Sequence, residues 1–375
     1  MDAPRNPWRK WWLPVLVLLI GMAARLWVAT LGHNYDLDSW SIVADITWHG
    51  GNVYAETDRY EYGPVWFNIL HGLGVLARHN PQAFRYLVAG FLSLVDAGIY
   101  FFLRRRFGEG VGALFFLNPV SIIISGYHNQ FDNLAVLLGL LAIPLIGDDF
   151  DQPVGRRRFW GLVVLGSSLA TKHLLFAFPF WLAVKQKGLL QKLIVLAVPV
   201  LVFGLGFLPY WPAGREGIIH HVFLYRSELA RDYFYQYLVP PILQMGFNGQ
   251  AVWAGCLFIG AFLFRTKNSL ESLLYYTAVL VATSPAIVNQ YLAIPMAFVV
   301  THLNVFTVLY VVVLTLHLLV DPNGLHLAGL GFGECDDISI CLLFLAVIWT
   351  AWRQQVVALW QKCLFELKYQ LGIER

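Results

Sequence analysis

The sequence predicts an all-α polytopic membrane protein. Of its 375 residues, 58% are hydrophobic and only 13% are charged, whereas soluble domains carry about 25% charged residues. The mean hydropathy is +0.60, and apolar runs close to the roughly 20 residues needed to cross a bilayer recur along the whole chain. This composition excludes a water-soluble globule, and the small net charge of +3 gives no indication of a nucleic-acid partner.

These runs predict about twelve transmembrane helices in a single integral membrane domain over residues 1–375. The first run is too long for the core of a signal peptide and is not followed by a small-residue cleavage site, so we expect it to remain as a span. The expected helices lie near residues 13–31, 84–103, 110–126, 134–147, 158–171, 173–184, 189–208, 250–264, 269–283, 286–300, 303–320 and 338–352.

The basic residues of the short loops predict how these helices are oriented, because Lys and Arg stay on the cytoplasmic side. The triplets Arg104-Arg105-Arg106 and Arg156-Arg157-Arg158 fall on one side together with the basic residues near both ends of the chain. All these basic loops fall on the cytoplasmic side only if the apolar stretch from Pro64 to Ala77 does not cross the membrane. We therefore expect an interfacial or re-entrant helix there, and cytoplasmic N- and C-termini.

Two long segments are expected on the opposite face, which would be the periplasm, the exterior or the ER lumen. The first, residues 33–85, is acidic and would contain interfacial helices. The second, residues 209–247, is basic and aromatic, with Arg226 followed by a run from Tyr233 to Tyr237. An acidic segment and a basic aromatic segment therefore share one membrane face.

Two carboxylates follow the first predicted span, in the sequence Asn34-Tyr35-Asp36-Leu37-Asp38. Residues two apart face the same side only in an extended chain, so the pair can meet one ligand only if this stretch is extended. Asp38 or Ser39 is a natural N-cap for a short helix that runs through Trp48 and ends at Gly50-Gly51. The simpler alternative is that Asp38 only caps this helix and Asp36 is solvated.

Further polar motifs follow at the expected helix ends: Arg59-Tyr60-Glu61-Tyr62-Gly63-Pro64, Gly126-Tyr127-His128-Asn129-Gln130-Phe131-Asp132-Asn133, Thr171-Lys172-His173 and Asn289-Gln290-Tyr291-Leu292. Their order resembles the GT-C superfamily of integral membrane glycosyltransferases, which use polyprenyl- or dolichyl-phosphate sugars. The order is most similar to the enzymes that add the first mannose in glycosylphosphatidylinositol anchor assembly. The Lys172-His173 element is also similar to that of the dolichol-pathway glucosyltransferases. The pattern departs from the family at Val53, Glu61 and Ser39-Trp40, which leaves the sugar and acceptor open.

The resemblance implies a GT-C type bundle that transfers a hexose, with mannose favoured, to a lipid-linked or glycolipid acceptor with inversion. Such a transfer needs a base near the acceptor hydroxyl and positive charge near the leaving phosphate. Asp36 fits the base, while Asp38 would orient Asp36, bind sugar hydroxyls or share a divalent cation with it. The residues expected to contact substrate, with the phosphate candidates last, are Arg59, Tyr60, Tyr62, His128, Gln130, Asp132, Gln290, Tyr291, Lys172, His173 and Arg226.

Each assignment has a structural alternative. A charge such as Lys172 in an apolar context has either a function or a buried partner. His128, Gln130 and Asp132 could form only a turn between helices, and Arg226 could belong to an interfacial aromatic belt. Asp96 is expected to pair within the bundle, with Arg25 as one candidate. Two other protein classes also remain open: an ion-coupled transporter and a catalytically inactive subunit of a glycosylation complex.

Overall fold

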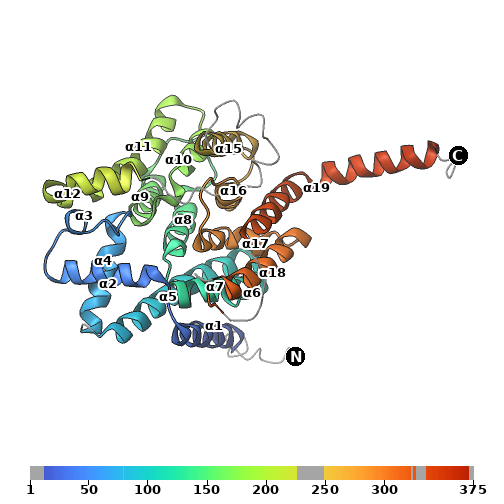
Figure 1. Cartoon of the computed structure of the whole chain (residues 1–375). Helices are drawn as coiled ribbons and strands as arrows, with labels where there is room; N and C mark the ends of the chain where they lie inside the picture. The colour runs from blue at the N-terminus through green and yellow to red at the C-terminus, as the bar shows by residue number, and fades with distance from the viewer. Residues whose placement is uncertain (1–11, 79, 226–248, 322–323, 327–334, 371–375) are drawn as a thin grey trace, which may run out of the picture.

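The structure of the protein is a computed structural model that describes residues 12–78, 80–225, 249–321, 324–326 and 335–370. Within these ranges the chain forms helices and turns and no β-strand (Figure 1). Arg226 and the Tyr233–Tyr237 run, which the sequence analysis singled out, lie outside the described residues. The all-helical class predicted from the sequence is confirmed for the described part of the chain.

The first half of the chain contains the helices α1 (Trp12–Leu31), α2 (Tyr35–Trp48), α3 (Val53–Glu56), α4 (Pro64–Ala77), α5 (Pro81–Phe107), α6 (Glu109–Phe116), α7 (Pro119–Ile123), η2 (Ile124–His128), α8 (Asp132–Ile146), α9 (Arg156–Thr171) and η3 (His173–Leu175). The second half contains α10 (Phe178–Ala183), α11 (Leu189–Gly206), η4 (Leu208–Tyr210), α12 (Trp211–Gly217), η5 (Ile218–Phe223), α15 (Gly249–Leu263), α16 (Ser269–Ala282), η6 (Asn289–Ala293), α17 (Met296–Thr301), α18 (Val305–Val320) and α19 (Asp336–Gln370).

Three helical stretches in the described residues are long and apolar enough to cross a membrane: α1, α5 and the continuous stretch Leu189–Phe223. A fourth arises if α6 and the segment Pro119–His128, which meet at 45°, are counted as one broken span. Five further apolar helices, α4, α8, α15, α16 and α18, have only 14 to 16 residues each. The structure therefore fits a helical membrane protein, whereas the count of about twelve spans stays a prediction.

Three of the expected continuous helices are interrupted. The expected helix 110–126 is interrupted before Pro119. The expected helix 173–184 is interrupted before α10, which has Pro179 in its first turn. The expected helix 286–300 is interrupted before α17, whose N-cap is Pro295. Proline has no backbone N–H to donate and its ring collides with the preceding turn, so a helix rarely continues through it. Apolar content alone did not reveal these interruptions, and two of them leave irregular backbone beside the polar site described below.

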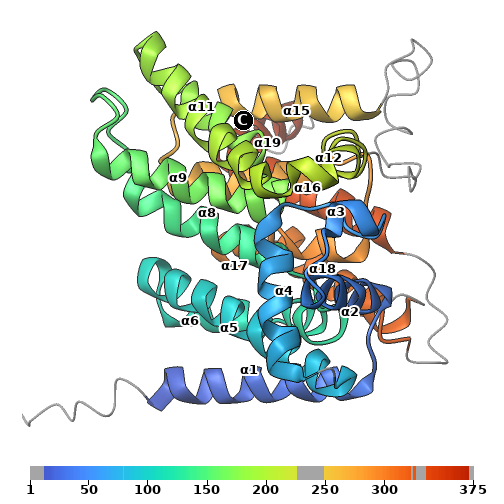
Figure 2. The ribbon, with the colours of Figure 1, turned by 90° about the vertical axis from the view of Figure 1, so that its left-hand side faces the viewer.

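The long helices lie side by side in a stack, in which α1 packs on α5, α5 on α6 and α8, α8 on α9, and α9 on α11 (Figure 2). The short helices α2 and α4 run across the direction of α1, as the two perpendicular views show (Figures 1 and 2). This crosswise orientation is the one expected of helices that lie along a membrane surface. It supports, without establishing, the interfacial assignment of Pro64–Ala77.

A buried polar network joins α1 to α5. Arg25 and Asp96 are both fully buried, and Arg25 Nη2 lies 2.9 Å from Asp96 Oδ2. The Asp96 carboxylate also accepts hydrogen bonds from Ser121, Ser125 and Asn133. The predicted pairing of Asp96 with Arg25 is therefore confirmed. A buried ion pair is tolerated when its remaining lone pairs are satisfied in this way.

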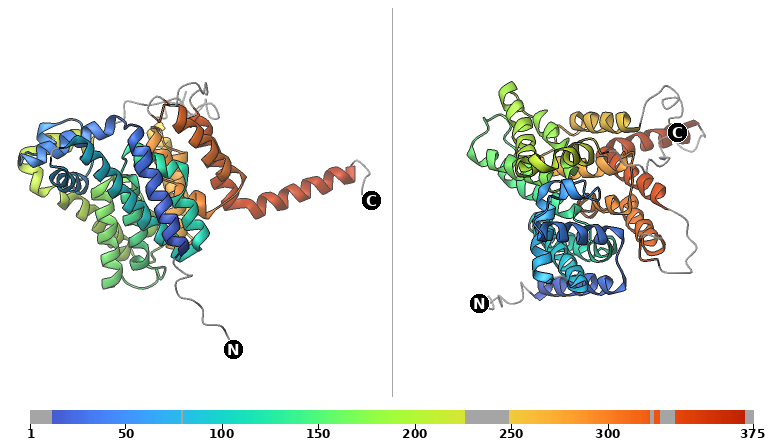
Figure 3. Two further views of the ribbon diagram at one scale, coloured as in Figure 1. Left: turned by 90° about the horizontal axis from the view of Figure 1, so that it is seen from below. Right: turned by 60° about the vertical axis from the view of Figure 1, so that its left-hand side comes forward.

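The C-terminal helix α19 packs on α16 and α18 and bends at Trp352, whose φ of −124° is not helical. Beyond this bend its backbone continues as a helix away from the bundle (Figure 3). The sequence predicted the part before the bend, near residues 338–352.

Candidate functional site

The segment that carries the two carboxylates is helical, and this corrects the extended conformation expected from the sequence. Asn34 is the N-cap of α2: its Oδ1 accepts from the backbone N–H of Asp36 at 3.2 Å. The capping residue is thus neither Asp38 nor Ser39, although the helix ends at Trp48 as predicted. With Asn34 as its N-cap, the helix starts four to five residues earlier than predicted, so both carboxylates lie in its first turn.

Because the segment is helical, Asp36 and Asp38 point in different directions. The Asp38 side chain is 57% exposed, and its nearest described ion-pairing atom is His33 Nδ1 at 3.9 Å. Asp36 is partly buried and faces the interior of the molecule. The two carboxylates therefore do not form one site, and a divalent cation shared between them does not fit this geometry.

The Asp36 carboxylate is held by two amide groups. Asn34 Nδ2 donates to Asp36 Oδ2 at 2.9 Å, and Gln130 Nε2, from the turn before α8, donates to the same oxygen. Burial raises the pKa of Asp36 above its usual range, and the nearby charge of Lys172 partly opposes that shift. These contacts fix the position of the carboxylate and leave Oδ1 without a described hydrogen bond.

The deepest part of the site is an ion pair between Lys172 and Asp132. Lys172 Nζ lies 2.8 Å from Asp132 Oδ2, and the two side chains are 3% and 1% exposed. Three aromatic rings surround the ammonium, with centroids 5.0 Å away for Tyr62 and Phe131 and 5.4 Å for Tyr291. Of the alternatives left open for Lys172, the structure thus provides the buried partner, and a cation facing aromatic rings is further stabilised.

Helix ends bring these side chains together. Lys172 is the extended C-cap of α9, and Asp132 is the first residue of α8. The turn before α8 is closed by Asn129, which adopts the left-handed conformation with φ of 54°, a region that Asn tolerates better than most residues. The loop before α4 reaches the same point because Gly63 lies against the backbone of Ala170, where a Cβ atom would come within 2.0 Å of the carbonyl oxygen.

The remaining predicted residues lie at different distances from this centre. Tyr60 is fully buried, donates its hydroxyl hydrogen to Gly63 O at 2.6 Å and accepts from the backbone of Phe67, so in this structure it holds the loop together. Arg59 is half-buried, with its guanidinium 3.9 Å from the ring centroid of Tyr35. His173 begins η3 beside Lys172, and Gln290 is half-buried in η6 beside Tyr291.

Two residues outside the predicted set belong to the site. Asn34 links Asp36 to His128, because its Nδ2 lies 3.1 Å from His128 Nδ1 and can only donate. Glu61 interacts electrostatically with both Lys172 and Asp36, and burial raises its pKa to about 7 although a hydrogen bond with Tyr225 opposes the shift. Asn34 and Glu61 belong to the same motifs as Asp36 and Tyr62. The sequence alone did not show which of the neighbouring polar side chains point toward the site.

Several buried polar atoms at the site have no hydrogen-bond partner among the described residues: His128 Nε2, Gln130 Oε1, Asp132 Oδ1 and His173 Nδ1. Buried polar atoms in folded proteins are nearly always paired with protein or water. Their concentration around Asp36 and Lys172 indicates a place where a polar ligand or water binds. No group of three or more His, Cys, Asp or Glu side chains suited to a metal ion occurs in the described residues.

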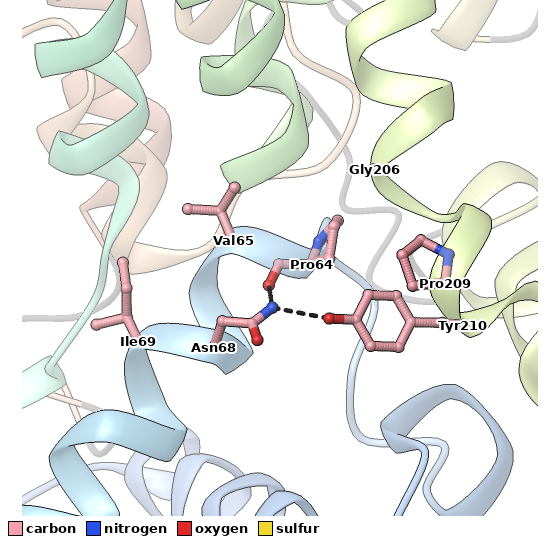
Figure 4. A pocket seen from close by; sticks show the side chains of 7 residues that line it. All are labelled: Pro64, Val65, Asn68, Ile69, Gly206, Pro209 and Tyr210. Atoms are coloured by element: carbon pink, nitrogen blue, oxygen red, sulfur yellow. Dashed lines mark hydrogen bonds between the residues drawn. The ribbon is translucent and has the colours of Figure 1, made fainter.

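An apolar groove opens beside the site, with a volume of about 450 Å³ (Figure 4). It begins at Pro64, two residues after Tyr62, and lies between the start of α4 and the end of α11. Asn68 crosses its floor, donating to Pro64 O at 2.7 Å and to the Tyr210 hydroxyl at 3.1 Å. The lining residues are Pro64, Val65, Asn68, Ile69, Gly206, Pro209 and Tyr210.

Comparisons with known protein families, with curated proteins and with solved structures find no match to this chain. The functional interpretation therefore depends on the site and on the resemblance of its motifs.

Proposed function

We propose that the protein is an inverting membrane glycosyltransferase of the GT-C type, with about twelve spans and a site on the non-cytoplasmic face. It would move a hexose, with mannose favoured by the resemblance, from a polyprenyl- or dolichyl-phosphate donor to a lipid-linked or glycolipid acceptor. The observation that carries the proposal is the convergence of Asp36, Gln130, Asp132, Lys172 and Tyr291 from four separated motifs on one buried polar centre.

Asp36 has the features that a general base for this reaction requires. Its Oδ2 is occupied by two amide donors, so Oδ1 is the atom available to accept the proton of an acceptor hydroxyl. The acceptor oxygen attacks the anomeric carbon, the bond from that carbon to the phosphate oxygen breaks, and polyprenyl phosphate leaves. Burial raises the pKa of Asp36 toward neutral pH. A general base is most effective when its pKa lies near the pH at which the enzyme works.

The phosphate group is assigned differently from the expectation based on sequence. Lys172 is enclosed by Asp132 and three aromatic rings, so an anion could reach it only by displacing the carboxylate. We assign Lys172 to the electrostatic control of Asp36 and Asp132 instead. For the phosphate we propose Arg59 instead, a half-buried cation whose guanidinium lies 3.9 Å from the ring centroid of Tyr35, the neighbour of Asp36 in sequence.

The apolar groove supports a lipid-linked substrate. It lies between the start of α4 and the end of α11, and α11 exposes large apolar side chains such as Leu193 and Leu201. An isoprenoid chain in this groove would contact Pro64, which directly follows the loop that carries Tyr62.

The decisive experiment uses purified full-length protein in detergent with a polyprenyl-phosphate hexose, with and without a glycolipid acceptor. A transferase releases polyprenyl phosphate only when acceptor is present, and an Asp36→Asn protein does not. A transporter would move or bind the donor and leave its phosphate–sugar bond intact. Absence of release over a panel of polyprenyl-phosphate hexoses and acceptors would contradict the proposal.

A further inference from the structure

The turn that carries Tyr291 is held from one side by α18. This turn, η6, follows an irregular segment, and the ring of its residue Tyr291 reaches the polar centre. Tyr310 of α18 donates its hydroxyl hydrogen to the carbonyl of Leu292, and His317 of α18 meets the side chain of Asn289. Tyr310 and His317 are two helical turns apart and therefore lie on one face of α18. This face forms hydrogen bonds with Asn289 at the start of η6 and with Leu292 near its end.

The hydrogen bonds of His317 determine which ring nitrogen carries the proton. The backbone N–H of Cys335 donates to Nδ1 at 3.3 Å, so Nδ1 is an acceptor. Nε2 therefore carries the hydrogen and donates it to Asn289 Oδ1 at 2.8 Å, while the buried Asp321 carboxylate lies 3.7 Å from the same nitrogen. The His317 side chain is 1% exposed, which makes this hydrogen bond a buried one. The Cys335 backbone thus fixes the tautomer through Nδ1, and the Nε2–H of that tautomer points to Asn289 of η6.

We infer that His317 is a positioning residue of the polar centre, which acts by fixing η6 and with it the Tyr291 ring against the Lys172 ammonium. The chain of contacts runs from His317 to Asn289 at 2.8 Å, then along η6 to Tyr291, whose ring centroid lies 5.4 Å from Lys172 Nζ. The sequence beyond residue 300 carries no motif that indicated this role. The catalytic consequence of the inference rests on the proposed function, whereas its structural consequence does not.

The test compares three variants of the full-length protein. His317→Gln places an amide N–H near the position of Nε2 and retains the donor to Asn289. His317→Asn is polar but too short to reach Asn289, and His317→Leu removes the donor while remaining bulky. A purely steric role would favour Leu over Asn and would give Gln no advantage, so the order of the three variants reports the hydrogen bond itself.

The first measurement is independent of catalysis: acylation of Lys172 by a small anhydride, quantified by peptide mass spectrometry against the exposed Lys187. Lys172 should become about tenfold more reactive in His317→Leu and His317→Asn, because a buried acceptor that loses its partner favours local opening. It should stay as protected in His317→Gln as in the parent protein. Equal protection in the parent and in whichever of the Leu and Asn variants folds, or equal exposure in all three, would overturn the inference.

The second measurement is turnover with a polyprenyl-phosphate hexose. His317→Gln should stay within about threefold of the parent, whereas the other two variants should lose roughly ten- to a hundredfold in kcat, as expected for a displaced site. If the parent protein transfers no hexose, the proposed function fails and the acylation result still decides the role of His317. If the parent is active and the three variants are equally active, the positioning role is contradicted.

Discussion

Lys172 Nζ and Asp132 Oδ2 lie 2.8 Å apart at the junction of α9 and α8, with both side chains almost completely buried. Three aromatic rings face the ammonium, and the carboxylate is its only described counter-charge at hydrogen-bond distance. A desolvated pair of this kind holds two helix ends in register. It also sets the electrostatic potential at Asp36, since the charge of Lys172 lowers the pKa of Asp36 against the effect of burial.

Breaking this pair from one side should destabilise the fold. We expect Lys172→Met or Asp132→Leu to lower the free energy of unfolding by about 3–5 kcal/mol, because each leaves the partner buried without its counter-charge. The double variant Lys172→Met/Asp132→Leu should recover much of this loss. Denaturant unfolding of all three in detergent measures the coupling, and purely additive effects would show that the pair is not an energetic unit.

The base assignment predicts unequal effects at the two carboxylates of α2. Asp36→Asn keeps the size of the side chain and removes its basicity, so turnover should fall by about 10²- to 10⁴-fold. Asp38→Asn should retain turnover within about threefold, because the Asp38 side chain is exposed and neither caps α2 nor faces Asp36. Kinetics of both purified variants decide the point. A folded Asp36→Asn protein with near-parental turnover would end the assignment.

Glu61 should make stability depend on pH. Burial raises the pKa of Glu61 to about 7 in the folded protein, against about 4.3 for an ordinary glutamate. Folding therefore favours the protonated form, and the contribution of this group is present below about pH 4.3 and is lost as pH rises through about 7. The melting temperature of the parent relative to Glu61→Gln should fall over this window. A constant difference between the two proteins would contradict the shifted pKa.

Gly63 should tolerate no side chain. A Cβ atom there would meet Ala170 O at 2.0 Å, a backbone atom that cannot rotate away. Gly63→Ala should therefore displace the loop that carries Tyr62 and lower both stability and turnover. Gly72→Ala is the matched control in α4, where a Cβ atom meets nothing within 4 Å, and it should stabilise the helix by about 0.5–1 kcal/mol. Equal melting temperatures for the two variants would show that the Gly63 contact can relax.

The predicted orientation can be tested by labelling. In a protein without its four native cysteines, a cysteine introduced at Arg105 should react with a membrane-impermeant maleimide only from the cytoplasmic face. A cysteine at Asp38, whose side chain is exposed, should react only from the opposite face. Reaction of both positions from the same face would remove the basis for placing residues 33–85 outside the cytoplasm.

Much of the helical framework could be predicted from the sequence, since apolar runs are local signals, although the interruptions at Pro119, Pro179 and Pro295 were missed. The runs that became α1, α4, α5 and α8 were recognised within a few residues of their observed bounds. The start of α2 was predicted wrongly, because Asn34, Asp38 and Ser39 are all competent N-caps and sequence does not rank them. The position of the N-cap decides whether this segment is extended or helical, and therefore whether the Asp36 and Asp38 side chains can face the same ligand.

The sequence by itself determined that the chain is helical and apolar, and that its polar residues gather in a few motifs at helix ends. Only the tertiary structure decided that Asp36 and Gln130 share a hydrogen bond, that Lys172 pairs with Asp132, and that His317 grips the turn of Tyr291. These contacts join residues 28 to 94 positions apart. The physical reason is that a helix period shows which side of a helix is apolar, whereas a buried charge takes as partner whichever side chain the packing of other helices brings within about 3 Å.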